Sequence, residues 1–115
     1  MFRWFRFLLL SWCLGLALPA WAADAARGRE IAHSQEKGNC LACHRMPRDA
    51  GAETAANMGP VLENLTARYP DRAALRARVW DGSRFNADTI MPPYGRHRIL
   101  TEEEIDHVVE YLRGL

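Results

Sequence analysis

The sequence has no excess of charge of either sign, and this absence narrows the classes of partner. It contains 15 lysines and arginines against 14 aspartates and glutamates, a formal net charge of +1 at pH 7. A protein that binds the phosphates of nucleic acid needs a basic surface, and this composition provides no such excess. We therefore expect no nucleic-acid partner. Hydrophobic residues make up 49% of the 115 residues, which is typical of a globular protein and excludes disordered and fibrous chains.

The chain also lacks an apolar stretch long enough to span a membrane. The apolar run 7–18 is about 12 residues long, whereas a bilayer needs about 20. Two arginines precede this run, and Ala20-Trp21-Ala22 follows it with small residues at both positions that determine cleavage. We predict that residues 1–22 are a signal peptide, cleaved on export to the periplasm, and that residues 23–115 form one domain. The mature chain is expected to have no membrane span.

Cysteine is scarce, and its spacing is informative. Cys13 lies within the predicted signal peptide, so the mature chain keeps only Cys40 and Cys43. An exported protein with a disulfide framework has several widely spaced cysteines, whereas these two are close neighbours. They belong to Cys40-Leu41-Ala42-Cys43-His44, the pattern in which two thiols bind haem covalently and the histidine binds its iron. A redox dithiol would need a βαβ context, and a zinc site would need a second pair of ligands. The motif therefore predicts one covalent haem c, with His44 as a metal ligand.

No alternation typical of strands extends beyond a few residues, and the sequence contains helix signals instead. A first helix is predicted over about 24–35, where helix-forming residues precede Gly38-Asn39. Another begins after Pro70-Asp71 and ends at Gly82. The stretch 49–57, rich in alanine and glycine, is predicted to be a loop. These signals indicate an all-α fold.

The last helix has the clearest boundaries. Thr101 and Glu104 form a capping-box pattern at its start, and Gly114 ends it. Its apolar residues recur with helical spacing and predict one buried face: Ile105, Val108, Val109 and Leu112. We expect this face to pack on the first helix, where the small residues Gly28 and Ala32 allow a close approach. Because about 90 residues bury little surface, the haem would fill much of the core, and we expect the chain without haem to be poorly folded.

Iron that is bound by one histidine has a second axial position, and the sequence offers six candidates for it. These are Met46, Met58, Met91, His33, His97 and His107. Met46 follows His44 by two residues and therefore lies on the same side of the haem. We expect Met58 to be a core side chain, because methionine often fills gaps in cores. We expect His33 at a helix end and His107 on the solvent-exposed side of the last helix, opposite its apolar face.

Met91 stands in a different setting from the other candidates. It precedes Pro92 and Pro93, which fix the backbone and remove two donors, so that the loop is stiff and extended. Such a loop can hold a thioether against iron. We predict Met91 to be the second metal ligand. A core methionine in an ordinary loop is the other interpretation, and His97 on the same loop is the alternative ligand.

Three separated blocks resemble class I c-type cytochromes over nearly the whole mature chain. They are the motif 40–44, Gly59-Pro60, and the Met-Pro loop at Met91 that precedes a terminal helix. This resemblance implies a class I cytochrome c fold, in which three to four short helices wrap around one covalent haem. It also implies that the carbonyl of Pro60 accepts a hydrogen bond from the second ring nitrogen of His44. A simple turn-forming role is the alternative for Pro60.

A narrower resemblance covers residues 38–115. The blocks 38–44, 57–62 and 91–95, with His97 and the pairs 99–100 and 104–105, are similar to SoxX, the family of monohaem subunits of the SoxAX cytochrome of bacterial thiosulfate oxidation. The chain departs from that pattern in two places. Met58 stands where isoleucine or valine is expected, and Tyr94 stands where phenylalanine is expected.

The SoxX resemblance implies a role in a heteromeric enzyme. In this heterodimer, an L-cysteine S-thiosulfotransferase, thiosulfate is oxidatively coupled to a cysteine of the SoxYZ carrier protein. The chemistry would occur at a haem of a SoxA-like dihaem cytochrome subunit, and this chain would accept the electrons and pass them to a downstream acceptor. The sequence agrees with that division, because it has no spare cysteine, no Ser/His/Asp set and no evident carboxylate pair. No catalytic residue is expected in this chain.

Two other functions stay open. One is a free, diffusing periplasmic cytochrome c that carries electrons, and the other is a ligand-binding haem protein with an open axial position. A diffusing carrier often docks through a collar of lysines, whereas Lys37 is the single lysine here. Trp80 is a candidate to donate to a haem propionate, although core packing is the simpler role. Four arginines are candidates for propionate or partner binding, although exposed arginines are usually only solvated: Arg45, Arg48, Arg96 and Arg98.

Overall fold

The structure is a computed structural model, and it describes residues 22–115. The predicted signal peptide lies outside the described residues except for Ala22, and it stays a prediction. The elements are helical: α1 (Ala25–His33), η1 (Cys40–Ala42), α2 (Leu65–Arg68), α3 (Arg72–Trp80), η2 (Gly82–Arg84) and α4 (Glu102–Arg113). Residues 22–115 contain no strand, so the predicted all-α fold is confirmed. No helix in this range is long and apolar enough to cross a membrane.

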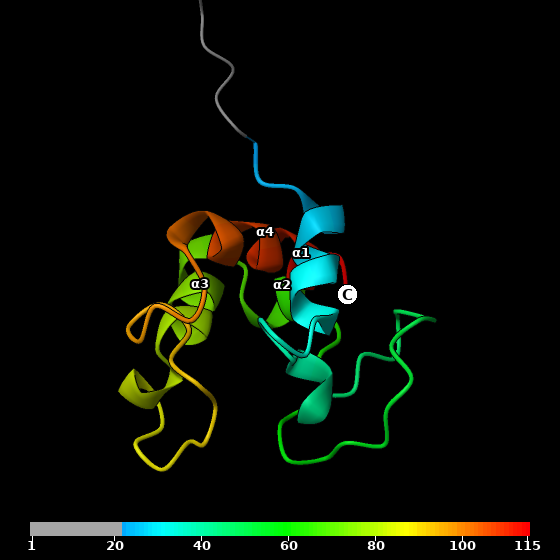
Figure 1. Ribbon diagram of the computed structural model, residues 1–115, viewed down its shortest axis with the longest axis horizontal. Coiled ribbons are helices and arrows are strands. Elements are labelled where there is room, and N and C mark those ends of the chain that lie inside the picture. Colours follow the sequence, from blue (N-terminus) through cyan, green and yellow to red (C-terminus); the bar gives the residue numbers. More distant parts are fainter. Residues whose placement is uncertain (1–21) are drawn as a thin grey trace, which may run out of the picture.

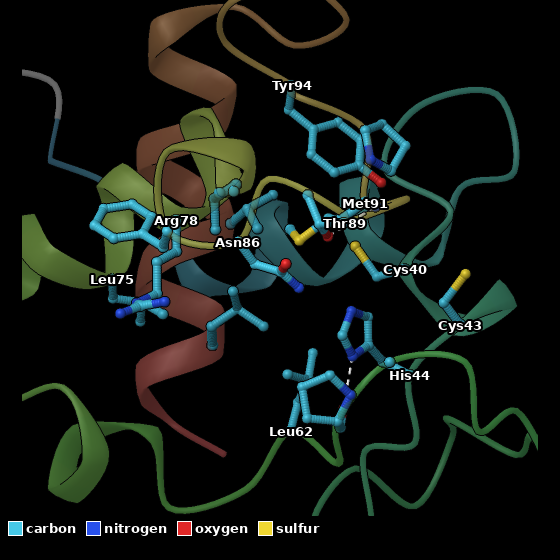
Figure 2. Close-up of a pocket in the computed structure, with 18 of the residues that line it drawn as sticks. Cys40, Cys43, His44, Leu62, Leu75, Arg78, Asn86, Thr89, Met91 and Tyr94 are labelled. Atoms are coloured by element: carbon cyan, nitrogen blue, oxygen red, sulfur yellow. Dashed lines mark hydrogen bonds between the residues drawn. The ribbon is translucent and has the colours of Figure 1, made fainter.

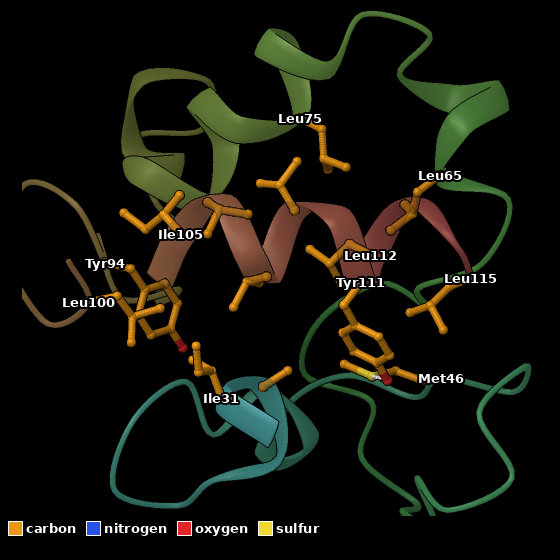
Figure 3. Close-up of a cluster of buried hydrophobic side chains, with 14 of the residues drawn as sticks. Ile31, Met46, Leu65, Leu75, Tyr94, Leu100, Ile105, Tyr111, Leu112 and Leu115 are labelled. Atoms are coloured by element: carbon orange, nitrogen blue, oxygen red, sulfur yellow. Dashed lines mark hydrogen bonds between the residues drawn. The ribbon is translucent and has the colours of Figure 1, made fainter. Parts of the chain in front are cut away.

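Helix α4 is the centre of the fold, because α1, α2 and α3 all contact it (Figure 1). The hydroxyl of Thr101 accepts from the backbone N–H of Glu104 at 3.1 Å, and the Glu104 carboxylate accepts from the backbone N–H of Thr101 at 3.1 Å. This is the predicted capping box, which satisfies two otherwise unpaired backbone donors. The four residues of the predicted apolar face are all buried: Ile105, Val108, Val109 and Leu112. Tyr111, which is also buried, extends this face (Figure 3).

Helices α1 and α4 pack closely because glycine occupies the contact. A Cβ atom at Gly28 would overlap the backbone carbonyl of His107 in α4. Only glycine therefore allows this approach of the two helices. Ala32, which is fully buried, continues the small-residue face, and Ile31 beside it is 1% exposed. The predicted pairing of the two helices is thus present.

The environment of His107 differs from the sequence expectation. Its side chain is only 12% exposed, and its Nδ1 accepts a hydrogen bond from the backbone N–H of Asp24 at 2.7 Å. The expectation of a solvent-exposed histidine is wrong, because the start of α1 covers this side of α4. Asp24 also caps α1, since its carboxylate accepts from the backbone N–H of Ala26 at 2.9 Å.

Helix α3 begins after the cap residue Asp71 and buries Leu75 and Val79. Ion pairs connect its outer side to α4: Arg72 lies 2.6 Å from Glu110 and Arg76 lies 2.9 Å from Asp106. The short helix α2 was not expected, because the sequence around it has neither a cap pattern nor a long apolar period. Two long loops, 43–64 and 85–101, extend from this helical framework and reach below it in the view of Figure 1. The predicted loop 49–57 is part of the first.

Candidate functional site

A cavity of about 430 Å³ lies between the two long loops and helices α3 and α4 (Figure 2). Its walls are mostly apolar, and they include residues from segments far apart in the sequence. The first loop and the segment before it contribute Cys40, Cys43, His44 and Pro60, the second loop contributes Met91 and Tyr94, and the helices contribute Leu75, Val79, Val108 and Leu112. All five predicted site residues therefore line one cavity.

The cysteine motif forms one tight turn at the cavity wall. The backbone N–H of Cys43 donates to the carbonyl of Cys40 at 3.2 Å, and that of His44 donates to the same carbonyl at 2.9 Å. All three residues, Cys40, Cys43 and His44, line the cavity (Figure 2). Both cysteines are free thiols. Burial raises the pKa of Cys40 to about 11, whereas the attacking thiol of a redox dithiol has a lowered pKa.

The ring of His44 is held by the segment that follows in the first loop. Its Nδ1 lies 2.6 Å from the carbonyl oxygen of Pro60, which can only accept, so Nδ1 is the donor and Nε2 keeps its lone pair (Figure 2). A Cβ atom at Gly59 would lie 2.6 Å from His44 Nδ1, so only glycine allows the backbone to pass over the ring. The backbone N–H of Gly59 also donates to the carbonyl of Cys43 at 2.8 Å. This geometry is the one that the resemblance implied for Pro60.

Met91 reaches the cavity from the other loop. Its backbone N–H donates to the hydroxyl of Thr89 at 3.2 Å, and Pro92 follows it along the cavity wall. Figure 2 shows the Met91 and His44 side chains on the lining of the same cavity. The loop thus presents a thioether to the space that the imidazole also faces.

The other candidates for an axial ligand lie elsewhere, with one exception. His97 is exposed and does not line the cavity. Met46 is 1% exposed in the apolar cluster, where its sulfur accepts from the hydroxyl of Tyr111 at 3.3 Å. His33, at the end of α1, lies 3.1 Å from the carboxylate of Asp49.

Met58 is the exception among these candidates, and the sequence expectation for it is wrong. It is 65% exposed and lines the cavity instead of packing in the core. The reason is the path of the chain at Gly59, which crosses the ring of His44 and leaves the preceding side chain outside the apolar cluster.

Three charged residues that the sequence did not single out line the cavity: Arg68, Arg78 and Asp88. Arg78 lines the cavity from α3, and its guanidinium carbon lies 4.3 Å from the ring centre of Phe85. Within residues 22–115 it makes no ion pair. The sequence contained one signal for the position of Arg78: it follows the apolar Leu75 by three residues, and residues three apart lie on the same face of a helix.

The arginines and the tryptophan that the sequence suggested lie outside the cavity lining. Arg96 pairs with the buried Asp81 at 3.3 Å, and Arg48 donates to the side chain of Asn64 at 3.1 Å. The indole N–H of Trp80 donates to Glu102 at 2.9 Å. Trp80 therefore connects α3 to the start of α4.

Comparisons with known proteins agree with this geometry. A family model described as cytochrome c matches residues 25–115. A search of curated proteins found no match. Among solved structures, a chain of the crystal structure of SoxXA from P. pantotrophus superposes with a TM-score of 0.72 and 23% sequence identity, over 82% of this chain and 82% of that chain. This likeness shows the fold, with its helices around one cavity.

Proposed function

The chain belongs to the cytochrome c family, and we propose that it is the electron-accepting subunit of a periplasmic complex of the SoxAX type. It has the class I cytochrome c fold, and its cofactor is one covalently bound haem c with its iron. When bound, this group supplies an iron that takes up and releases one electron. The protein is therefore an electron-transfer cytochrome, and the proposal concerns the residues that hold the haem and the partner that supplies the electrons.

We propose that Cys40 and Cys43 hold the haem through thioether bonds and that His44 binds the iron. The two free thiols and the imidazole on one turn of chain suit this attachment. Pro60 orients His44: its carbonyl accepts a hydrogen bond from Nδ1–H, so Nε2 would be the nitrogen that binds the iron. Gly59 leaves room for the ring in that orientation.

Met91 is the proposed second axial ligand. The observation that carries the proposal is that His44 and Met91 enter one cavity from two separate loops. With His44 and Met91 both binding the iron, the haem would be suited to electron transfer and not to binding a substrate. This argues against the alternative of a ligand-binding haem protein.

Arg78 is proposed to bind a haem propionate. A guanidinium that lines a mostly apolar cavity without an ion pair within residues 22–115 attracts a carboxylate strongly. Its stacking against Phe85 at 4.3 Å fixes the direction of the side chain.

The ligand assignment is tested by removing each cavity methionine in turn. Met91→Ala should abolish the absorption band of the oxidised holoprotein that arises from charge transfer from sulfur to iron, and Met91→His should lower the reduction potential. Met58→Ala is the matched control and should keep the band. If the band survives without Met91 and disappears without Met58, the assignment is wrong.

The SoxAX role rests on two lines of support. The sequence blocks around Cys40, Pro60 and Met91 resemble SoxX, and the fold is similar to a chain of a SoxXA crystal structure. In this role the chain contributes no catalytic group. It receives electrons released when a SoxA-like dihaem subunit couples thiosulfate to the SoxYZ carrier, and it passes them to a downstream acceptor. A freely diffusing carrier is the alternative.

Reconstitution distinguishes these two roles. The isolated holoprotein should not be reduced by thiosulfate, even with the carrier protein present. Coexpressed with a SoxA-like cytochrome, it should copurify at low micromolar concentration, and thiosulfate with carrier should then reduce an artificial acceptor. Failure to copurify, together with rapid electron exchange between the isolated chain and a terminal oxidase, would favour the diffusing carrier. Mass spectrometry of the periplasmic protein tests the predicted processing: it should find one haem on a chain that begins at Ala23.

A further inference from the structure

Two neighbouring residues, Tyr94 and Gly95, hold the Met91 loop in place. Both follow Met91 in the sequence. Tyr94, three residues after Met91, is 6% exposed, and its hydroxyl donates to the backbone carbonyl of Gly38. Gly38 lies two residues before Cys40. One hydrogen bond therefore connects the Met91 loop directly to the start of the haem-attachment segment.

The acceptor of this hydrogen bond is itself held rigidly. The backbone N–H of Gly38 donates to the carbonyl of Ile31 in α1 at 3.1 Å, and a Cβ atom at Gly38 would lie only 2.8 Å from that carbonyl oxygen. Gly38 is buried, and within residues 22–115 the Tyr94 hydroxyl is the donor to its carbonyl. Without that hydroxyl, a buried acceptor loses its partner, which is costly.

The next residue fixes the loop on the opposite side. The backbone N–H of Gly95 donates to the carbonyl of Trp80 at 3.0 Å, and a Cβ atom at Gly95 would overlap the indole ring. Trp80 is held in turn by its hydrogen bond to Glu102. Positions 94 and 95 thus join the attachment segment on one side to the end of α3 on the other.

Among residues 22–115, the N-terminal side of the loop has no comparable hydrogen bond to a distant segment. Its hydrogen bonds are local: the backbone N–H of Met91 donates to the hydroxyl of Thr89 at 3.2 Å, and the backbone N–H of Thr89 donates to the carbonyl of Asn86 at 3.2 Å. Ile90 between them is 70% exposed. Met91 itself packs against the apolar cluster, and beyond that contact its position depends on the hydrogen bonds of residues 94 and 95.

We propose that Tyr94 is a positioning residue for the axial ligand: its hydrogen bond to Gly38 holds the Met91 loop against the haem-attachment segment and so strengthens the methionine–iron bond. This inference rests on the proposed ligation by Met91. A competing ligand can bind the iron only if Met91 withdraws, and withdrawal of the loop breaks the Tyr94–Gly38 bond. The hydroxyl of Tyr94 therefore opposes ligand exchange.

The test is a titration of the oxidised holoprotein with imidazole, followed by absorbance. Tyr94→Phe keeps the buried ring and removes only the hydroxyl. Its affinity for imidazole should rise about tenfold, which corresponds to about 1.4 kcal/mol and is within the range of one hydrogen bond. Tyr69→Phe is the matched control, because the Tyr69 hydroxyl makes no hydrogen bond within residues 22–115, and its affinity should stay within about twofold of the wild type.

The outcomes separate this inference from the proposed function. If Tyr94→Phe lowers the unfolding midpoint but binds imidazole as the wild type does, the residue is only structural and the inference is wrong. The same conclusion holds if Tyr69→Phe shows an equal rise. Met91→Ala is measured in parallel: if it leaves both the charge-transfer band and the imidazole affinity unchanged, the ligand assignment itself fails.

Discussion

The α1–α4 pair and the two loops around the cavity bury their side chains in different ways. In the helix pair, Ala32, Ile105 and Val109 are completely buried. In and next to the loops, large apolar side chains stay exposed, with Met58 at 65% and Ile90 at 70%. The comparison teaches that the helix pair excludes solvent from its contact, whereas the loops leave apolar surface for the cavity's occupant to cover and are held by a few points of attachment.

The two regions nevertheless share part of their apolar surface. Seven of the 15 buried residues of the apolar cluster also line the cavity: Leu65, Leu75, Val79, Tyr94, Leu100, Val108 and Leu112. Loss of the haem would therefore expose one side of the core that the helices share. Because of this overlap, we expect loss of the haem to destabilise the helices as well as the loops.

The largest effect is expected when the haem cannot be attached. The double variant Cys40→Ala, Cys43→Ala should lose most of its helical circular dichroism and its cooperative thermal transition, because haem binding and folding draw on the same free energy. Circular dichroism of the purified variant beside the holoprotein measures this. Native helix content in the variant would contradict this expectation, since the helices would then be stable without the haem.

A smaller effect is expected from the contact between the helices. Gly28→Ala places a methyl group against the backbone of His107, and overpacking of this kind should destabilise the holoprotein by about 3 kcal/mol. Gly114→Ala is the matched control, because a Cβ atom there meets its nearest neighbour, the Tyr111 carbonyl, at 3.4 Å. Urea unfolding of both variants measures the difference. Equal stabilities of Gly28→Ala and Gly114→Ala would show that the α1–α4 contact has room for a methyl group, contrary to the distances in the structure.

The first loop is attached to the helix pair through a partly buried carboxylate, that of Asp49. Asp49 accepts from the guanidinium of Arg29 at 2.7 and 3.0 Å and from the hydroxyl of Tyr111 at 2.6 Å, and His33 lies 3.1 Å away. These partners belong to α1 and α4. The Arg29 guanidinium holds the pKa of Asp49 well below its usual range, and the Tyr111 hydroxyl adds to this effect.

The smallest of the three effects is therefore expected from Asp49→Asn. The loss of charge-assisted hydrogen bonds should cost about 2 kcal/mol at pH 7. Because the folded-state pKa is depressed, the wild-type advantage is fully present above the unfolded pKa of about 3.9 and is lost as the pH falls through the folded pKa. The difference between the two proteins should be constant from pH 5 to 7 and narrow below about pH 4.

Urea unfolding across that pH range measures the effect of Asp49→Asn. The control is Glu53→Gln in the same loop, an exposed residue without an ion pair within residues 22–115, which should change stability by less than about 0.5 kcal/mol. A wild-type advantage that grew on acidification would contradict the assigned direction of the Asp49 pKa.

Local signals in the sequence were sufficient for the helices and for the attachment motif. Thr101 with Glu104 predicts the start of α4, and Gly28 with Ala32 predicts the face of α1 that meets it, since caps and periodic patterns act within a few residues. Where the predictions were wrong, the deciding contact was distant in the sequence. His107 is covered by Asp24, which lies 83 positions away, and no helix pattern contains that information.

The site shows the same division. Its cysteines and His44 were predicted because their chemistry needs a fixed local spacing, and Met91 was selected because two prolines follow it. The exposure of Met58 and the placement of Arg78 in the cavity depend on how the two loops and α3 come together, so they required the structure.

The sequence by itself determined that this chain is helical, that it carries a single attachment motif for haem, and which residues begin and end its main helices. These properties follow from covalent spacing and from hydrogen bonds that span one turn of helix. Only the tertiary structure decided that Tyr94 meets Gly38 and that Asp49 joins Arg29 to Tyr111. Such contacts link segments that are neighbours only after the loops have closed, because a hydrogen bond is made over about 3 Å while its partners lie tens of residues apart.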